Sequence, residues 1–166
     1  MFKKLFGKKE EQPKTITVYA PLTGGLLTLE EVPDPVFSQK MMGDGLAVKP
    51  SEGIVVSPVD GEVIQVFPTK HAIGIKALNG AEILLHIGIE TVGLNGEGFT
   101  TLINEGDKVK AGDQLVEFDL AFVTEKAAST ITPVIITNGD QMATIDKKTV
   151  SETVAGETVI MEITSN

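Results

Sequence analysis

The stretch GIVVSPVDGEVIQVFPTKHAIGIKALNGAEILLHIGI, residues 53–89, decides the fold. It consists of short runs rich in valine and isoleucine, and each run ends at glycine, proline, asparagine or aspartate. β-branched residues favour extended strands, whereas the four terminating residue types favour turns. The stretch therefore predicts consecutive antiparallel strands joined by tight turns.

The same rhythm continues on both sides of this stretch, from Thr15 onward. The expected strand-and-turn units are residues 15–24, 53–61, 62–68, 72–80, 81–89, 100–109, 114–120, 132–140 and 157–163. We expect an all-β protein, an antiparallel β-sandwich or barrel with at most short helical turns. The one stretch with helical spacing is LAFVTEKAAS, residues 120–129, where Leu120, Val123 and Ala127 can share a face.

Two pairs of segments resemble each other within the chain. APLTGGLLTL (20–29) matches SPVDGEVIQV (57–66), and AGDQLV (111–116) matches AGETVI (155–160). Their glycines fall where turns require unusual backbone angles, and apolar pairs follow them. The pattern predicts a duplicated, hairpin-rich motif whose two copies share one core. Independent convergence of β-turns on similar sequences is the alternative that remains open here.

The length of 166 residues fits one domain with a sizeable core, which we place at residues 15–166. Residues 1–14 are expected to form a flexible basic tail with five lysines and two glutamates. Met1, Phe2, Leu5 and Phe6 recur at helical spacing among these lysines, which predicts a weak contact of residues 1–9 with an anionic membrane surface. A solvated tail is the alternative.

Composition excludes several classes of function. The formal net charge is −9, residues 15–166 carry nine lysines against 21 acidic residues, and the chain has no arginine. Such a body does not bind nucleic acid through counterion release, but it attracts a basic protein partner. The absence of cysteine rules out disulfides and thiolate zinc sites and fits a cytoplasmic location. No apolar run is long enough to cross a membrane.

The two histidines are the candidates for covalent chemistry. Strand alternation in EILLHIGIE places Ile83, Leu85, Ile87 and Ile89 on the core face, and Glu82, Leu84, His86, Gly88 and Glu90 on the other. The Gly88 carbonyl can then accept a hydrogen bond from Nδ1–H of His86, which leaves Nε2 as a neutral nucleophile.

His71 follows Thr69 by two residues, so the threonine hydroxyl can orient the second imidazole ring. The pair suits phosphoryl transfer to His86, with His71 as the stabilising neighbour. Two half-buried structural histidines are the alternative.

Two other classes of site fit the chain less well. Catalytic zinc requires three protein ligands, so Glu82 or Glu90 would have to join the two imidazoles. The chain has no H-x-H or HExxH pairing, which disfavours a zinc peptidase. The turn VKAGDQLVEF is similar to those of lipoyl or biotin carriers, but Lys110 and Lys126 lack the flanking residues of a modified lysine.

Five stretches together resemble the glucose-type EIIA component (EIIA type 1) of the bacterial phosphoenolpyruvate-dependent sugar phosphotransferase system. They are EVPDPVFSQKMMGDGLAVKP (31–50), SPVDGEVIQVFPTKHAIGIK (57–76), LLHIGIETVGLNGEGF (84–99), EGDKVKAGDQLVEFDL (105–120) and TPVIITN (132–138). They cover most of the domain, and LLHIGIETVGL is highly specific.

The resemblance implies a β-sandwich with a duplicated motif and a phosphohistidine carrier that needs no cofactor and no intrinsic metal. Such a protein takes a phosphoryl group from the carrier HPr and passes it to the EIIB domain of a sugar transporter. By their places in the motif, His86 is phosphorylated at Nε2 and His71 stabilises the phosphoryl group. Thr69 orients His71, and the Gly88 carbonyl orients His86.

The resemblance also implies a shallow apolar docking surface around the histidines. The matching residues are apolar Val36, Phe37, Met41, Met42, Phe67, Leu84 and Val92, with acidic Asp34 and Glu90 at the rim. Glu90 stands where some relatives have aspartate, so the negative charge is kept but the side chain reaches further. Core packing is the alternative for each apolar residue.

A regulatory binding module is the second class of function that remains open. Some relatives bind metabolic enzymes or transporters when unphosphorylated, and zinc can then bridge His71 and His86 to a partner carboxylate. An accessible transfer site favours a monomer.

Overall fold

The computed structural model describes residues 12–166, so the predicted membrane contact of residues 1–9 lies outside it, as does most of the predicted tail. The described part consists mainly of short strands joined by turns. The strands are β1 (Thr15–Tyr19), β2 (Gly24–Thr28), β3 (Asp44–Pro50), β4 (Ile54–Val56), β5 (Gly61–Val66), β6 (Ala72–Ala77), β7 (Glu82–His86), β8 (Phe99–Thr101), β9 (Lys108–Val109), β10 (Gln114–Phe118), β11 (Thr132–Ile136), β12 (Met142–Lys147), β13 (Glu152–Thr153) and β14 (Val159–Ser165). The helices are η1 (Leu29–Glu31), α1 (Pro35–Ser38), η2 (Val92–Leu94), α2 (Leu120–Lys126) and η3 (Gly139–Gln141), where η marks a 3₁₀ turn.

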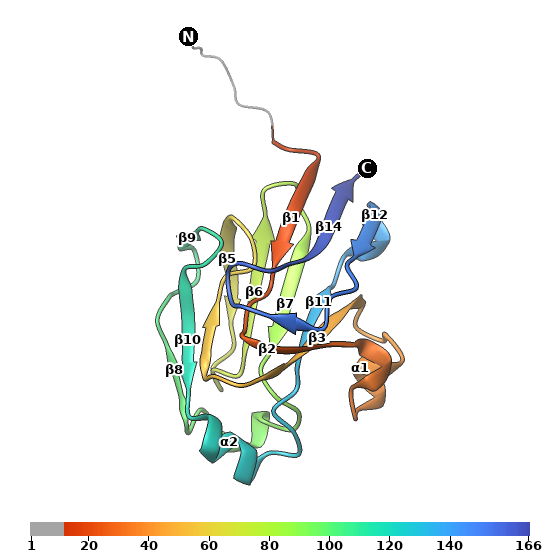
Figure 1. Cartoon of the computed structure of the whole chain (residues 1–166). Helices are drawn as coiled ribbons and strands as arrows, with labels where there is room; N and C mark the ends of the chain where they lie inside the picture. Colours follow the sequence, from red (N-terminus) through yellow and green to blue (C-terminus); the bar gives the residue numbers. More distant parts are fainter. Residues whose placement is uncertain (1–11) are drawn as a thin grey trace.

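The strands form one large sheet and two small ones (Figure 1). The large sheet has the order β13-β2-β3-β11-β7-β6-β5-β9, and the small sheets have the orders β1-β14-β12 and β4-β10-β8. Every strand pair is antiparallel. The predicted antiparallel β-sandwich is confirmed.

The sheet orders show the predicted duplication directly. In the large sheet, β13-β2-β3-β11 on one side of the centre corresponds to β9-β5-β6-β7 on the other. The small sheet β1-β14-β12 corresponds in the same way to β4-β10-β8. One half of the molecule is therefore β4–β10, and the other is β11–β14 together with β1–β3. The two halves meet where β7 pairs with β11.

Matching backbone hydrogen bonds join the two halves at the repeated segments. Tyr19 N–H donates to the Pro58 carbonyl over 2.8 Å, and Val56 N–H donates to the Pro21 carbonyl over 2.9 Å. The repeated Ala-Gly turns behave alike, because Gly112 donates to Ser57 and Gly156 donates to Ala20. The sequence repeats thus mark equivalent turns, and the duplicated hairpin-rich motif is confirmed.

The large sheet buries apolar side chains on both faces. Its inner face, with Ile73, Ile83 and Leu85, packs into the main core between the sheets. On its outer face a smaller cluster joins side chains of the sheet to side chains of the segment around η1 and α1. The members of this cluster are Leu29, Val32, Phe37, Ala47, Ala72, Leu84, Ile89 and Ile135. The chain between β2 and β3 therefore covers part of the outer face.

The predicted helical turn is present as α2, but the sequence analysis missed α1. The Asp34 carboxylate accepts a hydrogen bond from Val36 N–H over 2.9 Å, and Pro35 occupies the first helical position. Aspartate followed by proline is a recognised helix start. A helix of four residues is too short to produce a helical period of apolar residues, so this start signal is its only mark in the sequence.

Candidate functional site

Both histidines lie where β6 and β7 run side by side. Ala72 of β6 pairs with His86, the last residue of β7, and Ile87 N–H donates to the His71 carbonyl over 2.7 Å. These backbone contacts bring the two imidazole rings together, with their centroids 4.8 Å apart and their planes at 81°. The predicted pairing of His71 with His86 is thus present in the fold.

Each imidazole ring is held through Nδ1. His86 Nδ1 lies 2.8 Å from the carbonyl oxygen of Gly88, so this nitrogen must carry the proton and donate it. His71 Nδ1 lies 2.7 Å from the hydroxyl of Thr69. Because both Nδ1 atoms are engaged, the Nε2 atoms remain for chemistry. Gly88 and Thr69 thus each contact Nδ1 of a histidine that lies two residues away in the chain.

A sharp turn after β7 points the Gly88 carbonyl at the His86 ring. Gly88 has a φ of +77°, and a Cβ there would lie 2.7 Å from Cγ2 of Thr91. The Thr91 hydroxyl donates to the Ile87 carbonyl over 2.7 Å, and Gly88 N–H donates to the Thr132 hydroxyl over 3.3 Å. Thr91 and Thr132 are both fully buried.

The sequence analysis missed this support for the Gly88 turn. Thr132 lies 44 residues from Gly88, and no local pattern links the two. The turn also ends the strand alternation that was expected to continue to Ile89. Ile89 therefore packs in the outer-face cluster rather than in the main core.

Two phenylalanines flank the histidine pair. The Phe37 ring centroid lies 5.0 Å from that of His86, and the Phe67 centroid lies 5.6 Å from that of His71. His71 is buried, with 3% of its surface exposed, whereas His86 is half-buried at the surface. The four rings form a continuous apolar row in which only His86 combines a tethered ring with access from solvent.

Burial keeps both imidazoles neutral at pH 7. It lowers the pKa of His71 from 6.5 to about 4, and the nearby charge of protonated His86 adds to this effect, while the backbone of Thr69 opposes it. Burial also lowers the pKa of His86, against the opposing effects of the Gly88 carbonyl and the Asp34 carboxylate. A neutral His86 with its proton on Nδ1 has a lone pair on Nε2 and can act as a nucleophile.

The sequence matches a family model along most of its length. Residues 16–142 match the phosphoenolpyruvate-dependent sugar phosphotransferase system, EIIA 1. The chain belongs to this EIIA family.

Curated relatives cover the whole chain. The glucose-specific EIIA component of the phosphotransferase system from Halalkalibacterium halodurans is 58% identical over an alignment of 169 positions, which covers 98% of each chain. The component of the same name from Staphylococcus aureus strain Mu50 is 55% identical over 166 residues, all of both chains. A solved structure, glucose permease IIA from Mycoplasma capricolum, matches with a TM-score of 0.80 and 38% identity, over 95% of this chain and 98% of that one.

The apolar residues predicted to form the EIIA docking surface divide into two groups. Phe37 and Leu84 are buried in the outer-face cluster, and Phe67 packs against it. The remaining four are exposed, by 38% to 68% of their surface: Val36, Met41, Met42 and Val92. The first group therefore packs in or against the outer-face cluster, whereas the side chains of the second group lie at the surface.

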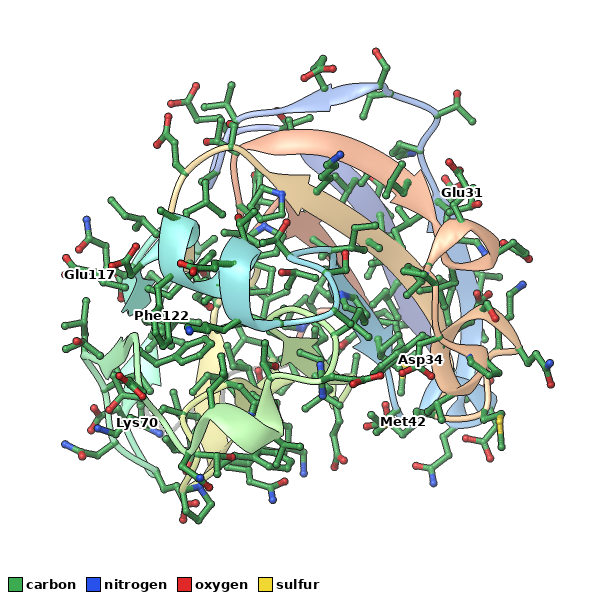
Figure 2. The ribbon with its side chains drawn as sticks, turned by 90° about the horizontal axis from the view of Figure 1, so that it is seen from below. Glu31, Asp34, Met42, Lys70, Glu117 and Phe122 are labelled. Atoms are coloured by element: carbon green, nitrogen blue, oxygen red, sulfur yellow. The ribbon has the colours of Figure 1, made fainter. Side chains whose placement is uncertain are left out.

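The predicted rim residues come from two different connections. Asp34, half-buried at the start of α1, lies close enough to His86 to affect its pKa. Glu90 is exposed and has a φ of +60° in the turn that follows Gly88. Figure 2 shows Asp34 and Met42 on the segment that carries α1. Met41 and Met42 line a surface hollow beside Gly43, Ile136 and Ile145.

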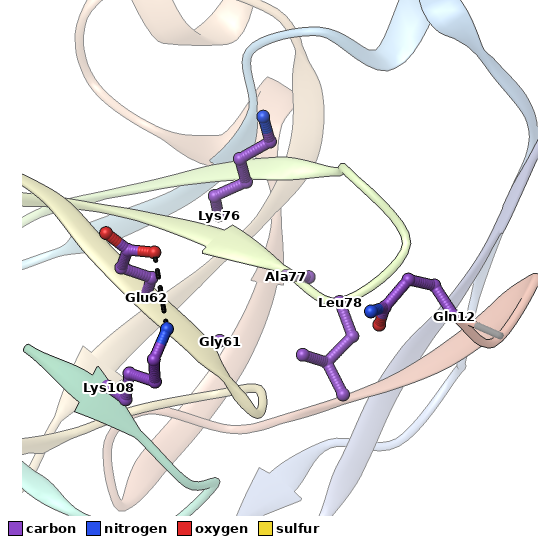
Figure 3. A pocket seen from close by; sticks show the side chains of 7 residues that line it. All are labelled: Gln12, Gly61, Glu62, Lys76, Ala77, Leu78 and Lys108. Atoms are coloured by element: carbon purple, nitrogen blue, oxygen red, sulfur yellow. Dashed lines mark ion pairs between the residues drawn. The ribbon is translucent and has the colours of Figure 1, made fainter. Parts of the chain in front are cut away.

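Other parts of the described surface offer no comparable arrangement of reactive groups. A hollow where β5, β6 and β9 meet contains the ion pair of Glu62 with Lys108, at 3.9 Å, and none of the predicted site residues (Figure 3). Within residues 12–166, no three histidine, cysteine or carboxylate side chains are grouped so that they could hold a metal ion. Over the same residues, no helix has the length and apolar character needed to span a membrane.

Proposed function

We propose that this chain is a phosphohistidine carrier, which receives a phosphoryl group from phosphorylated HPr and passes it to the EIIB domain of a sugar transporter. The observation that carries the proposal is the 2.8 Å contact between His86 Nδ1 and the Gly88 carbonyl. It fixes the tautomer that leaves Nε2 unprotonated at a partly exposed position. The relatives named glucose-specific favour glucose or a related sugar as the final acceptor.

In the receiving step, the Nε2 lone pair of His86 attacks the phosphorus atom of phosphorylated HPr. The new N–P bond forms on His86 while the old N–P bond breaks, and its electron pair returns to the ring nitrogen of HPr. Nδ1–H remains bonded to the Gly88 carbonyl, so the phosphorylated ring has substituents on both nitrogens and carries a formal positive charge beside the negative phosphoryl oxygens. In the delivering step, a nucleophile of EIIB attacks the same phosphorus atom and His86 Nε2 leaves.

His71 is proposed to hold the phosphoryl group without receiving it. When the Thr69 hydroxyl donates to Nδ1, the proton of neutral His71 is on Nε2, from which it can donate to a phosphoryl oxygen on His86. The apolar row of rings limits access of water to the phosphohistidine and strengthens this hydrogen bond. Because the chain has no arginine, any guanidinium that contacts the moving phosphoryl group must come from the partner.

The exposed residues Val36, Met41, Met42 and Val92, with Asp34 and Glu90, form the proposed docking surface. Exposed apolar side chains with acidic neighbours fit a transient partner that presents an apolar patch and basic groups. A cytoplasmic location belongs to the same proposal and fits the absence of cysteine.

The test is transfer of labelled phosphate from phosphoenolpyruvate through enzyme I and HPr to this protein. His86→Gln and His71→Gln serve as matched variants, because each alters one ring of the same pair. We expect wild type to gain an acid-labile, base-stable phosphate on Nε2, assigned by ³¹P NMR. His86→Gln should gain none, whereas His71→Gln should gain it but deliver it poorly to EIIB. Failure of wild type to accept label from demonstrably phosphorylated HPr would refute the proposal.

A further inference from the structure

The chain contains three Asn-Gly steps, at Asn79, Asn95 and Asn138. Asparagine followed by glycine is chemically labile, because the glycine has no side chain to hinder reaction of its backbone nitrogen. That nitrogen attacks the asparagine side-chain carbon and ammonia leaves, which produces a five-membered succinimide ring. Water then opens the ring at either carbonyl, to give aspartate or isoaspartate.

The structure protects the Asn79 step. The side-chain nitrogen of Asn79 donates to the carbonyls of Lys14 and Ile163 over 3.1 and 3.0 Å, and its oxygen accepts from Ala81 N–H. The attacking nitrogen is also engaged, because Gly80 N–H donates to the Ala77 carbonyl over 3.0 Å. Succinimide formation at Asn79 would break all of these bonds.

The Asn138 step is protected in a similar way. Its side-chain nitrogen donates to the Gly80 carbonyl over 2.9 Å, and its side-chain oxygen accepts from Glu82 N–H over 2.8 Å. These bonds tie the end of β11 to the turn before β7. Rotation of the Asn138 side chain toward the next backbone nitrogen would break both bonds.

Asn95 has no such protection. It is exposed, its backbone is left-handed with a φ of 55°, and its side chain makes one long contact, 3.4 Å to the Gly93 carbonyl. Within the part of the chain that the structure describes, Gly96 N–H donates to no backbone or side-chain acceptor. The nearest atoms that a Cβ at Gly96 would meet belong to the long side chain of Lys70, at 3.5 Å or more, so no backbone crowds the reacting nitrogen. We propose that Asn95 is a site of spontaneous deamidation, selected among the three Asn-Gly steps by the fold.

The position gives this modification a consequence for the transfer surface. Asn95 ends η2, the turn that carries exposed Val92 in the loop after His86. Isoaspartate adds one carbon to the main chain at this point, and either product adds one negative charge. The main-chain insertion displaces η2 and slows receipt of a phosphoryl group from HPr. This consequence rests on the proposed function, whereas the modification itself does not.

The test compares all three steps in one sample of the full chain, incubated at mildly alkaline pH and raised temperature and followed by peptide mass spectrometry. In the folded protein we expect Asn95 to react at least about tenfold faster than Asn79 or Asn138, because their reaction must first break several hydrogen bonds. In urea the three steps should react at similar rates, because their local sequences are alike. The proposal is overturned if Asn95 in the folded protein reacts no faster than Asn79 and Asn138, or if either of these two reacts first.

Two further samples separate modification from function. Asn95→Gln should stay unmodified, since its longer side chain does not form the five-membered ring. Asn95→Asp adds the charge without the main-chain insertion. Aged wild type should receive phosphate more slowly than fresh wild type, and equal rates would overturn the predicted effect on docking. If fresh wild type takes no phosphate, the proposed function fails while the mass spectrometry still decides the modification.

Discussion

His71 has the most perturbed environment of the residues in the candidate site. It lies among apolar rings with 3% of its surface exposed, and burial lowers its pKa to about 4. Between about pH 4 and 6.5 the unfolded chain binds a proton at this residue that the folded chain does not. Stability therefore falls as the pH falls through this window, and the loss is complete below the folded pKa.

The pH dependence of unfolding tests this environment. Urea unfolding at pH 7 and at pH 4.5 should show a loss of free energy of unfolding, of which His71 contributes on the order of 2 kcal/mol. His71→Gln cannot be protonated and should lose correspondingly less between the two pH values. An identical loss in the variant and in wild type would show that His71 is not held neutral by burial.

Thr69 tests whether the orientation of His71 matters. Thr69→Val keeps the shape but removes the hydroxyl that lies 2.7 Å from Nδ1. We expect the variant to receive phosphate on His86 normally and to deliver it to EIIB about tenfold more slowly, as expected for one lost hydrogen bond. Thr69→Ser keeps the hydroxyl and should deliver at nearly the wild-type rate. Stopped-flow or quench-flow transfer assays give both rates, and equal delivery by all three proteins would contradict the assignment.

At the scale of elements, the turn after β7 determines how His86 is presented. Gly88→Ala forces a side chain into a left-handed backbone and against Thr91, whereas Gly80→Ala, with a φ of +92°, meets no atom within 4 Å. Gly80→Ala should lower the free energy of unfolding by about 1–2 kcal/mol from backbone strain. Gly88→Ala should lower it by at least about 1 kcal/mol more, because neighbouring atoms must move.

The same pair of variants separates strain from function. Chemical denaturation gives the stabilities, and the NMR signals of His86 report its Nδ1–H contact. Only Gly88→Ala should disturb those signals. An equal loss of stability in both variants would mean that the Thr91 side chain moves aside at no cost in free energy and that the turn is not closely packed.

The start of α1 combines a structural and an electrostatic role in Asp34. Asparagine can keep the cap on Val36 N–H, whereas alanine cannot. Asp34→Ala should lower the free energy of unfolding by roughly 0.5–1 kcal/mol, while Asp34→Asn should leave it nearly unchanged. Both variants should lower the pKa of His86, since the Asp34 charge raises it. An NMR titration that finds the same His86 pKa in all three proteins would disprove the electrostatic role.

The strands that the sequence predicted are those with clear alternation or β-branched runs. β3, β12 and the two-residue β13 were not predicted. The sequence of β3, DGLAVKP, has glycine near its start and proline at its end, and four consecutive buried residues give it no alternation. It forms a strand because both neighbours in the sheet pair with it. Tertiary pairing, which a local pattern cannot show, decides such a segment.

The candidate site divides in the same way between local and distant residues. His71 with Thr69, and His86 with Gly88, are two residues apart, so the sequence could indicate both contacts. Four strands, β3 to β6, separate Phe37 from β7 and His86 in the chain, and the sequence related the two residues only through the family resemblance. The support of Gly88 by Thr132 was missed altogether.

At the scale of the whole molecule, one half is split between the two ends of the chain. Its strands β1–β3 come first and β11–β14 come last, with the other half, β4–β10, between them. Thr15 pairs with Thr164, and Ser165 N–H donates to the Lys14 carbonyl, so β1 and β14 lie side by side (Figure 1). Each half would be continuous in a chain that joined β14 to β1 and opened between β3 and β4.

A circular permutant tests the independence of the two halves. Opening at Ser51–Glu52, between β3 and β4, should yield a folded protein that receives phosphate on His86, because no strand is cut. Opening at Asn79–Gly80 instead separates β6 from β7 and breaks the hydrogen bonds of Asn79. Circular dichroism, thermal unfolding and the phosphate assay should rank the first permutant above the second. The reverse order would show that chain continuity between β6 and β7 is not needed.

The division of the site between the halves bears on how such a molecule could have arisen. His71 and His86 come from one half, and Phe37, which covers His86, comes from the β2–β3 connection of the other. By strand register, the counterpart of His71 is Asp44, which is bound to Lys147. If both halves descend from one ancestral gene, they have diverged in chemistry, because one half carries both histidines and the other supplies the Phe37 ring that covers His86.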